Sequence, residues 1–378
     1  MDSKDVAPTK VRRYDYAAQF GDDLDELVDD LKSILLSGEY ILSEEVGRFE
    51  SAFADFIGVR HARATNSGTD ALIVGFRAVG IQPGDEIITH ANTFYATVAA
   101  IVLAGGRPVL VDADDRSFLI DIEQAKSAVT GRTRALLPVH LYGKPTPMEP
   151  MLAIGRERDL LIVEDAAQAH GASIGGKRAG SFGTFAAFSF HPSKNLSAAG
   201  DAGALVTESD DLAHAVEAHR NLGQWVQNDH RLLGINSKMD AIQARVLFTK
   251  LKSLERWTSA RNEVAQAYRE LLHDLPVTFQ SNDLGEVHAY HLFQVRTDRR
   301  DALAEHLRGL GIDVVVRYPT PIHLQPAFSE FGWRKGEFPV AERLAQELLC
   351  LPIRPDMPES EIVFVVNGVR EYFGGTPT

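Results

Sequence analysis

The sequence contains little cysteine, no long hydrophobic run and no excess of basic residues. Its single cysteine, Cys350, excludes an internal disulfide framework and any metal or iron–sulfur site made of several cysteines, so we expect no metal. No apolar run approaches the roughly 18 residues of a membrane helix and no signal-peptide pattern opens the chain, so we expect a cytoplasmic protein without a membrane partner. The 39 basic and 52 acidic residues give a net charge of −13, which argues against a nucleic-acid partner.

The 378 residues are enough to bury a large core. Between residues 58 and 210, short apolar runs alternate with helical segments, which is the pattern of parallel strands joined by helical crossovers. We therefore predict a three-layer α/β domain with a mostly parallel seven-stranded sheet. Its strands are expected at residues 61–64, 86–89, 108–111, 135–139, 160–163, 185–189 and 204–207.

The pattern changes after a long helix predicted from about residue 240 to 273. Pro276 ends that helix, and a smaller α+β unit follows. We expect two domains: an N-terminal arm with a large domain over residues 1–255, and a small C-terminal domain over residues 256–378. The elements expected in the small domain are strands at 290–295 and 314–317 and helices at 299–310 and 340–350.

Lys194 follows the predicted strand 185–189, in the run HPSKNL. Open α/β sheets bind ligands beyond the carboxyl ends of their strands, so a lysine there can form a Schiff base with a carbonyl group. A solvated surface lysine is the simpler interpretation of an isolated lysine. Two other stretches favour the chemical role.

The first stretch is the acidic pair Glu164 and Asp165, which ends an apolar run typical of a strand buried on both faces. Asp165 therefore reaches the same rim as Lys194. A carboxylate beside the ring nitrogen of pyridoxal phosphate favours the charged pyridinium, and Gln168 in the following turn is placed to donate to the phenolic oxygen of the ring. Taken alone, the two acids are more typical of a helix N-cap or a surface ion pair.

The second stretch is the polar loop 66–70, which leads into a predicted helix. Such a helix start binds anions through its backbone N–H groups, the helix dipole and the hydroxyl of Ser67 or Thr69, so it can hold a phosphate without lysine or arginine. Taken alone, the loop is more typical of a plain capping motif. A phosphate loop, an acid after a strand and a lysine after a later strand, in that order, are together far more specific than any one of them.

Five motifs stand out along the chain: NSGTDAL, EDAAQAHGA, FSFHPSKNL, GDAGAL and GINSKMDAIQA. Together they resemble the motifs of the DegT/StrS-type sugar aminotransferases, and the resemblance runs from about residue 14 to about residue 352. It implies the aspartate-aminotransferase fold, known as PLP fold type I, and dependence on pyridoxal 5′-phosphate. It also implies a homodimer with shared active sites.

The resemblance implies roles for individual residues. Lys194 matches the lysine that carries pyridoxal 5′-phosphate as an internal aldimine, Asp165 matches the pyridinium partner and Gln168 its neighbour. Phe94 matches the aromatic residue that lies on the ring. Asn236 matches an asparagine that reaches the cofactor phosphate of the neighbouring subunit. The matching phosphate contacts are Gly68, Thr69 and Ser189.

Residues 318–328, YPTPIHLQPAF, resemble a segment typical of the branch that acts on 3-keto-6-deoxyhexose nucleotides. On that basis Tyr318 and His323 are expected to help to read the substrate. His170 and Tyr40 are further candidates for substrate contact, and packing is the other interpretation of each. The histidines interpreted as structural or solvated are His191, His288 and His291.

The resulting hypothesis is transamination in two halves. L-glutamate gives up its amino group, leaving pyridoxamine phosphate as the intermediate, and C3 of a dTDP-3-keto-6-deoxyhexose then takes that group, in deoxyaminosugar biosynthesis. Lys194 moves the proton between the donor and the cofactor.

Three alternatives stay open. The first is amination at C4 of a 4-keto-6-deoxyhexose nucleotide, and the second is a non-catalytic regulatory protein on the same fold. The third is a dehydratase of the same family. Dehydratases carry histidine in place of the Schiff-base lysine, and their iron–sulfur type needs several cysteines. Lys194 and the single Cys350 therefore count against a dehydratase.

Overall fold

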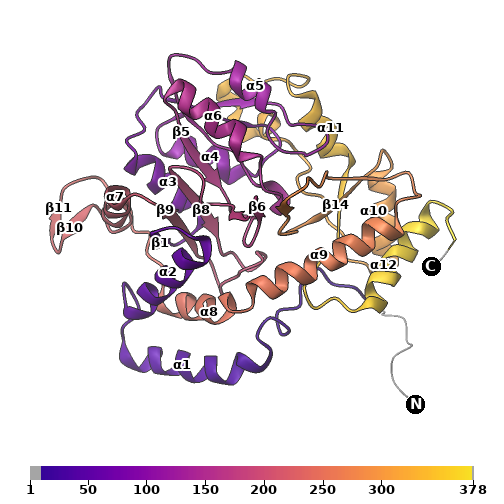
Figure 1. Cartoon of the computed structure of the whole chain (residues 1–378), viewed down its shortest axis with the longest axis horizontal. Helices are drawn as coiled ribbons and strands as arrows, with labels where there is room; N and C mark the ends of the chain where they lie inside the picture. The colour runs from indigo at the N-terminus through magenta and orange to yellow at the C-terminus, as the bar shows by residue number, and fades with distance from the viewer. Residues whose placement is uncertain (1–9, 377–378) are drawn as a thin grey trace.

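The computed structural model describes residues 10–376 (Figure 1). At its centre is a seven-stranded sheet with the strand order β1-β9-β8-β5-β4-β2-β3. Strand β9 pairs antiparallel with β1 and β8, and the other pairs are parallel. All seven strands predicted for this sheet are present, so the mostly parallel α/β architecture is confirmed. They are β1 (His61–Thr65), β2 (Glu86–His90), β3 (Arg107–Val111), β4 (Thr133–Leu136), β5 (Leu161–Asp165), β8 (Phe185–Ser189) and β9 (Gly203–Thr207).

Helices cover both faces of this sheet because each strand carries apolar side chains on both faces. Phe185 of β8 packs with α3, α4 and α7 on one face, and Phe188 of the same strand packs with α2 and α8 on the other. Met151 of α6 belongs to a cluster that extends the second layer over β4 and β5. The sheet is thus the middle of three layers, as Figure 1 shows. These helices are α2 (Glu44–Ile57), α3 (Gly68–Ala78), α4 (Tyr95–Leu103), α5 (Ile122–Ser127), α6 (Met148–Arg158), α7 (Asp210–Arg220) and α8 (Ala241–Leu251).

The single helix predicted over residues 240–273 is wrong, because the chain forms α8 and then α9 (Leu254–Leu271). The backbone at Ser253, with φ −98° and ψ −7°, departs from ideal helical values. This break lets Leu251 and Leu254 pack on the cluster under α2, while α9 carries the chain on to a second cluster around Tyr268. We propose that the predicted domain boundary at residue 255 lies in this first turn of α9.

The second cluster surrounds the antiparallel sheet β12-β14-β15 and includes residues of α9, α10 and α12. This arrangement is the α+β unit expected after residue 276. The helix α12 was not among the predicted elements. The elements of the unit are β12 (Thr278–Phe279), β14 (Phe293–Arg296), α10 (Arg300–Gly309), α11 (Pro339–Glu347), β15 (Leu348–Leu351) and α12 (Glu359–Tyr372).

One element predicted in this unit is too long and another is wrong in kind. The helix expected over residues 340–350 ends at Glu347, because the next four residues form the fully buried strand β15, which pairs with β14. The strand expected at 314–317 makes only an isolated bridge, from Val315 to Cys350. Short apolar runs suit a helix or a strand, and only their pairing partners decide between the two.

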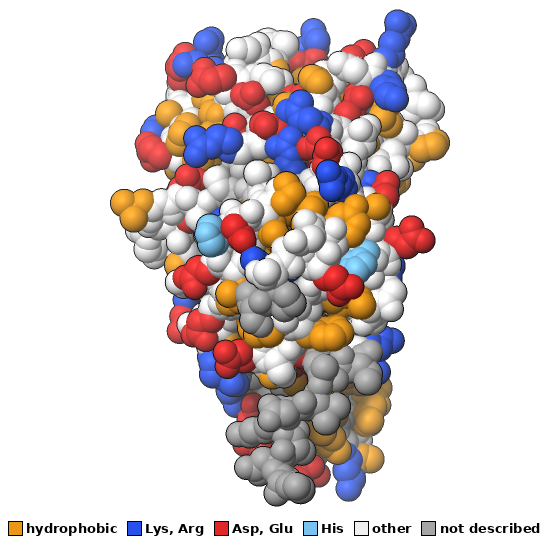
Figure 2. Space-filling model, turned by 90° about the vertical axis from the view of Figure 1, so that its right-hand side faces the viewer, with side chains coloured by type: hydrophobic (Ala, Val, Ile, Leu, Met, Phe, Trp, Pro, Cys, Tyr) orange, Lys and Arg blue, Asp and Glu red, His pale blue; other side chains and the backbone are white. Residues whose placement is uncertain are grey.

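The remaining elements are short or lie at the N-terminal end. They are η1 (Gly21–Asp23), α1 (Leu24–Ser37), η2 (Leu141–Gly143), β6 (Ser173–Ile174), β7 (Lys177–Arg178), β10 (Gln224–Val226), β11 (Asp229–His230), β13 (Glu286–Val287), η3 (Ile322–Leu324) and η4 (Pro326–Phe331). Within residues 10–376, no helix combines the length and the apolar character needed to cross a membrane. On the described part of the face in Figure 2, basic and acidic side chains are interspersed.

Candidate active site

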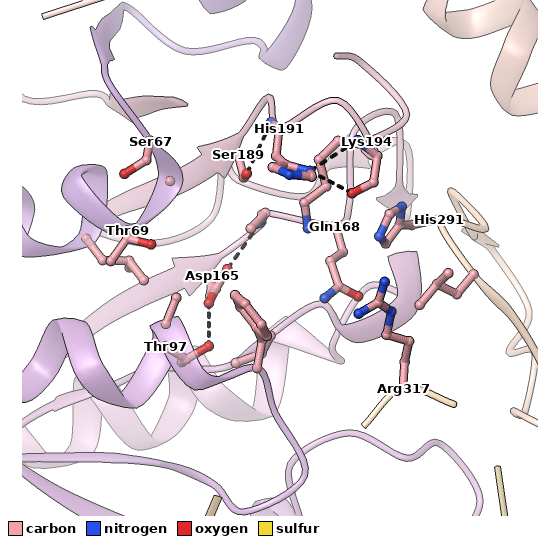
Figure 3. Close-up of a pocket in the computed structure, with 18 of the residues that line it drawn as sticks. Ser67, Thr69, Thr97, Asp165, Gln168, Ser189, His191, Lys194, His291 and Arg317 are labelled. Atoms are coloured by element: carbon pink, nitrogen blue, oxygen red, sulfur yellow. Dashed lines mark hydrogen bonds between the residues drawn. The ribbon is translucent and has the colours of Figure 1, made fainter. Parts of the chain in front are cut away.

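A cavity of about 340 Å³ opens where β5 and β8 end and α3 begins (Figure 3). Asp165 is the last residue of β5, Ser189 is the last of β8, and Gly68 is the first of α3. Because parallel strands end at the same edge of a sheet, residues far apart in the sequence meet there. The predicted site residues that line this cavity are Gly68, Thr69, Phe94, Asp165, Gln168, Ser189, Lys194 and Tyr318.

Lys194 lies in the loop after β8, where its backbone N–H donates to the carbonyl oxygen of His191 at 2.8 Å. Its ammonium group lies among protein atoms in the cavity, and this loss of water lowers its pKa to about 8. The nearby Asp165 carboxylate opposes the shift, and the charge of Arg317 adds to it. More of this amine is therefore uncharged near neutral pH than in an ordinary lysine, which favours attack on a carbonyl group.

Asp165 is buried, and both of its carboxylate oxygens accept hydrogen bonds. Thr97 Oγ1 donates to Oδ2 at 2.8 Å, and the backbone N–H of Ala167 donates to Oδ1 at 3.1 Å. Burial raises the pKa of Asp165, while these two hydrogen bonds and the charge of Lys194 oppose that rise. A cation placed against this carboxylate would be stabilised by its charge.

Glu164, the residue before Asp165, points to the opposite face of the sheet and fastens a loop there. Its carboxylate lies 2.9 Å from Nε2 of His140. The backbone N–H groups of Gly180, Phe182 and Gly183 also donate to it, at 2.7 to 2.8 Å. These contacts satisfy a carboxylate that is fully removed from water. Of the last two residues of β5, Asp165 therefore faces the cavity, and Glu164 holds a loop on the opposite face of the sheet.

Gln168 connects the cavity to two other segments of the chain. Its Nε2 donates to the Tyr318 hydroxyl oxygen at 3.0 Å, and its Oε1 accepts the backbone N–H of Tyr142 at 2.7 Å. The Tyr318 ring lies 5.3 Å from the Phe94 ring, measured between centroids. Burial raises the pKa of Tyr318, so its hydroxyl keeps its proton. One amide and two aromatic rings thus form a continuous wall.

The start of α3 forms a cradle against the end of β8. A Cβ built on Gly68 would lie 2.8 Å from Cβ of Ser189 and 3.1 Å from the carbonyl oxygen of Phe188, so only glycine fits there without displacement. Ser67 caps the helix by accepting the backbone N–H of Asp70 at 3.0 Å. Helix starts of this kind bind phosphate through backbone N–H groups.

These groups together fit pyridoxal phosphate. The amine of Lys194 suits the aldehyde of the cofactor, and the buried carboxylate of Asp165 suits its ring nitrogen. The cradle at Gly68 suits its phosphate, and Figure 3 shows Thr69 and Ser67 at that end of the cavity, away from Arg317.

Two predicted substrate contacts, His170 and His323, do not line the cavity. The His170 ring is fully buried, with centroid distances of 5.4 and 5.5 Å to the rings of Phe188 and Phe190, and burial lowers its pKa to about 3. His323 is also buried, and its Nε2 lies 2.9 Å from Oε1 of Glu342. Both histidines make interior contacts and lie outside the lining of this cavity, so their predicted contact with the substrate stays a prediction.

Tyr40 and Asn236 lie elsewhere on the surface. The Tyr40 hydroxyl donates to the carbonyl oxygen of Leu35 at 2.7 Å, and the side chain lines a shallow groove formed by residues 38–44. Asn236 is exposed, and its side-chain oxygen accepts from Lys238 Nζ at 2.6 Å. The role predicted for Asn236 requires a second subunit, so its place in a single chain does not test it.

The sequence analysis missed several residues of the cavity wall. Thr97 lies three residues after Phe94 at the start of α4, a spacing that places two side chains on one helix face. His291 was interpreted as structural, but it lines the cavity, and burial holds its pKa well below the usual range. Arg317 directly precedes Tyr318, and this proximity was the one signal available for it.

A comparison with known protein families shows to which family the chain belongs. The model of the DegT/DnrJ/EryC1/StrS aminotransferase family matches residues 22–370. The chain belongs to this family. One relative, a "Pleiotropic regulatory protein" of Geobacillus stearothermophilus, is 40% identical over 352 residues, which are 92% of this chain and 94% of that protein. The dTDP-3-amino-3,4,6-trideoxy-alpha-D-glucose transaminase of Streptomyces venezuelae is 41% identical over 344 residues, 90% of each chain.

Solved structures of DegT/DnrJ/EryC1/StrS aminotransferases confirm the fold. DesV of S. venezuelae, in complex with a ketimine intermediate, has a TM-score of 0.94 at 39% identity and covers 97% of this chain and 99% of its own. Ntda of Bacillus subtilis, with the bound cofactor PMP, has a TM-score of 0.91 at 29% identity. The match covers 98% of this chain and 87% of the Ntda chain. Membership of an aminotransferase family with such a structure implies dependence on pyridoxal phosphate.

Proposed function

We propose that this aminotransferase moves an amino group from L-glutamate to C3 of a dTDP-3-keto-6-deoxyhexose, a step of deoxyaminosugar biosynthesis. The observation that carries the proposal is the meeting of Lys194 and Asp165 in one cavity beside the cradle at Gly68. The name of the S. venezuelae relative, a transaminase of a dTDP-3-amino sugar, supports the nucleotide and the C3 position.

Different residues of the cavity are proposed to hold different parts of the cofactor. Pyridoxal phosphate supplies an electron sink that stabilises negative charge on the α carbon of the donor. We propose that Lys194 Nζ holds its carbonyl carbon and that Asp165 keeps the proton on its ring nitrogen. Phe94 packs on the ring and Gln168 donates to the phenolic oxygen. The residues proposed to hold the phosphate are Gly68, Thr69 and Ser189.

Lys194 is also the proposed proton carrier. When the donor's amino group displaces it, its Nζ takes the proton from the donor's α carbon. The pKa of about 8 supports this role, because the neutral amine needed to accept a proton is well populated near that pH. Nζ remains tethered beside the carbon that it must deprotonate, so no diffusing base is needed.

We propose that two copies of the chain share their active sites. Two of the regions that expose large apolar side chains bear on this proposal: residues 40–42 expose 43 to 47% of their surface, and Trp225 and Leu233 expose 52% and 92%. Clusters of exposed apolar side chains are typical of protein interfaces. Asn236, three residues beyond Leu233, is exposed and would serve the cofactor phosphate of the partner.

A regulatory role is the alternative of a different class, and one relative carries such a name. It is not favoured, because the chain retains the amine, the carboxylate and the cradle, and a relative of equal similarity is named as a transaminase. Amination at C4 uses the same catalytic residues, so the substrate experiment decides between the two positions.

The test is to follow the two half-reactions separately by cofactor absorbance. The protein, loaded with pyridoxal phosphate, receives L-glutamate; the donor is then removed, and a 3-keto and a 4-keto dTDP-6-deoxyhexose are offered in separate samples. We expect the initial spectrum to return with the 3-keto sugar alone. Its return with the 4-keto sugar alone would assign C4. A protein that binds no pyridoxal phosphate would contradict the proposal and favour the regulatory alternative.

A further inference from the structure

Arg317 places an unpaired positive charge in the cavity wall. Its side chain lines the cavity, and within residues 10–376 its guanidinium forms no ion pair, no side-chain hydrogen bond and no cation–π contact with the rest of the chain. Most arginines in the interior of this protein do have such partners: Arg220 pairs with Glu50, and Arg300 donates to two carbonyl oxygens. A guanidinium that faces a cavity without a partner is typical of a site for an anionic ligand.

The backbone of Arg317 is held firmly while its side chain is not. The Tyr142 hydroxyl, on a fully buried side chain, donates to the carbonyl oxygen of Arg317 at 2.9 Å. The next residue, Tyr318, is tied to Gln168 at 3.0 Å. The guanidinium is thus carried on a fixed support, so a bound anion would not have to order the segment itself.

The other charges of the cavity leave room for one more anion. Asp165 is engaged by Thr97 and Ala167, and Asp201, the second acid of the wall, forms no ion pair with Arg317. His291, which lies beside Arg317 in Figure 3, is buried, and burial keeps its imidazole neutral. Arg317 also lowers the pKa of Lys194, so the two cations are close enough to repel each other. An anion beside Arg317 would relieve this repulsion.

We propose that Arg317 binds the α-carboxylate of the amino-acid donor, an inference that rests on the proposed function. The donor's α carbon has to come within reach of Lys194 Nζ, and the α-carboxylate is one bond away from that carbon. The cofactor phosphate is assigned to the cradle at Ser67 and Thr69, which Figure 3 places at the other end of the cavity. The carbon skeleton of a keto sugar is uncharged where it reacts, and the diphosphate of the proposed sugar nucleotide is attached at C1, whereas the reacting carbon is C3. A planar guanidinium matches a carboxylate with two parallel hydrogen bonds.

The experiment compares the donor and sugar half-reactions of Arg317→Gln, Arg317→Lys and the unaltered enzyme. For the donor half, the holoenzyme is mixed with L-glutamate over a range of concentrations, and binding of 2-methylglutamate, which lacks the reactive α proton, is titrated by absorbance. For the sugar half, apoprotein loaded with pyridoxamine 5′-phosphate is mixed with the keto sugar nucleotide, so that no donor is needed. Arg299→Gln is the matched control, because Arg299 is an exposed arginine of the same unit.

We expect Arg317→Gln to raise the half-saturating L-glutamate concentration and the 2-methylglutamate dissociation constant roughly 10- to 100-fold, as expected for a lost charged hydrogen-bonded pair. Arg317→Lys should recover part of this loss, and the sugar half-reaction should change at least tenfold less. Unchanged donor binding, an equal loss in both halves, or a loss confined to the sugar would overturn the assignment. If the unaltered enzyme itself does not react with any amino acid, the proposed function fails, which is a different result.

Discussion

Thr97 at the start of α4 donates a hydrogen bond to Asp165 at the end of β5, with 2.8 Å between Oγ1 and Oδ2. The contact joins a helix to a strand 68 residues further along the chain. It holds one oxygen of the carboxylate, while the Ala167 N–H holds the other. The orientation of the acid is therefore set by the protein before any ligand is present.

Replacing this threonine should weaken cofactor binding. In Thr97→Val the buried carboxylate loses a donor, so the pKa of Asp165 should rise further and its charged form should be less available to a pyridinium. We expect the dissociation constant for pyridoxal phosphate to rise about tenfold, since a hydrogen bond to a charged group contributes about 1.5 kcal/mol or more. Thr207→Val removes a hydrogen bond of the same length, 2.8 Å, from a part-buried threonine to the neutral Thr184 carbonyl oxygen, away from the cavity. Equal cofactor affinities in the two variants would contradict this role of Thr97.

The lowered pKa of Lys194 predicts how cofactor attachment depends on pH. Only the neutral amine attacks an aldehyde, and the pKa of about 8 means that the neutral form grows as the pH rises through 8. The rate at which pyridoxal phosphate attaches to the apoprotein should therefore rise between about pH 6 and pH 8 and level off above, whereas an ordinary lysine keeps gaining up to pH 10 or more. Stopped-flow absorbance measures this rate. Lys194→Ala should show no attachment and no turnover, and an active Lys194→Ala enzyme would refute the assignment.

Gly68→Ala should damage the cradle by steric contact. The new Cβ would lie 2.8 Å from Cβ of Ser189, so either α3 or the end of β8 has to move. We expect at least a tenfold loss of affinity for pyridoxal phosphate, measured by titrating the apoprotein. Adding Ser189→Gly removes the nearest of the atoms that the new Cβ meets and should restore folding stability more than it restores affinity. Gly47→Ala on α2 is the control, because its new Cβ meets no atom within 4 Å.

His323→Ala should lower stability and leave substrate recognition unchanged. The His323 ring is buried, and its Nε2 lies 2.9 Å from the Glu342 carboxylate, whose pKa this contact helps to lower. Losing the contact should cost about 1 to 3 kcal/mol of the free energy of unfolding. Chemical denaturation and the KM values for both substrates give the two measurements. A change in the sugar's KM at unchanged stability would restore the role that the sequence predicted for His323.

Mixing two inactive variants tests the shared active site. If the partner's Asn236 serves each cofactor, a hybrid of Lys194→Ala and Asn236→Ala subunits contains one site with both native residues and one site with neither. We expect activity to appear when the two variants are refolded together, up to about a quarter of the native value for random pairing of equal amounts. No recovery, with hybrids shown by differential tagging, would place Lys194 and Asn236 in one chain's own site.

Most of the large sheet was predictable because its strands are buried on both faces and appear as apolar runs. Leu161 to Val163 and Phe185 to Phe188 belong to such runs, and the polar residues that end them, Asp165 and Ser189, mark the rim of the cavity. The same reasoning failed at Leu348–Leu351, since four apolar residues after a helix look like its continuation until β14 is available to pair with them.

The site was predictable where chemistry is local in the sequence and not where it depends on tertiary contact. Lys194 lies in the motif FSFHPSKNL and Gly68 in the motif NSGTDAL, so the sequence alone indicates both. The sequence around His323 does not indicate that Glu342 pairs with this histidine. The sequence around Arg317 does not indicate that its guanidinium has no carboxylate partner. Such facts depend on which segments the fold brings together.

The two neighbouring acids at the end of β5 have a further consequence. Glu164 fastens the loop at residues 180–183, and Asp165 faces the cavity, because successive side chains on a strand point to opposite faces. A shift of β5 by one residue against its neighbours would turn Asp165 away from the cavity and Glu164 away from the loop. Insertion or deletion of a single residue within this strand would therefore release the loop and displace Asp165 from the cavity in one event, whereas a change in the length of the loops around β5 leaves both carboxylates in place.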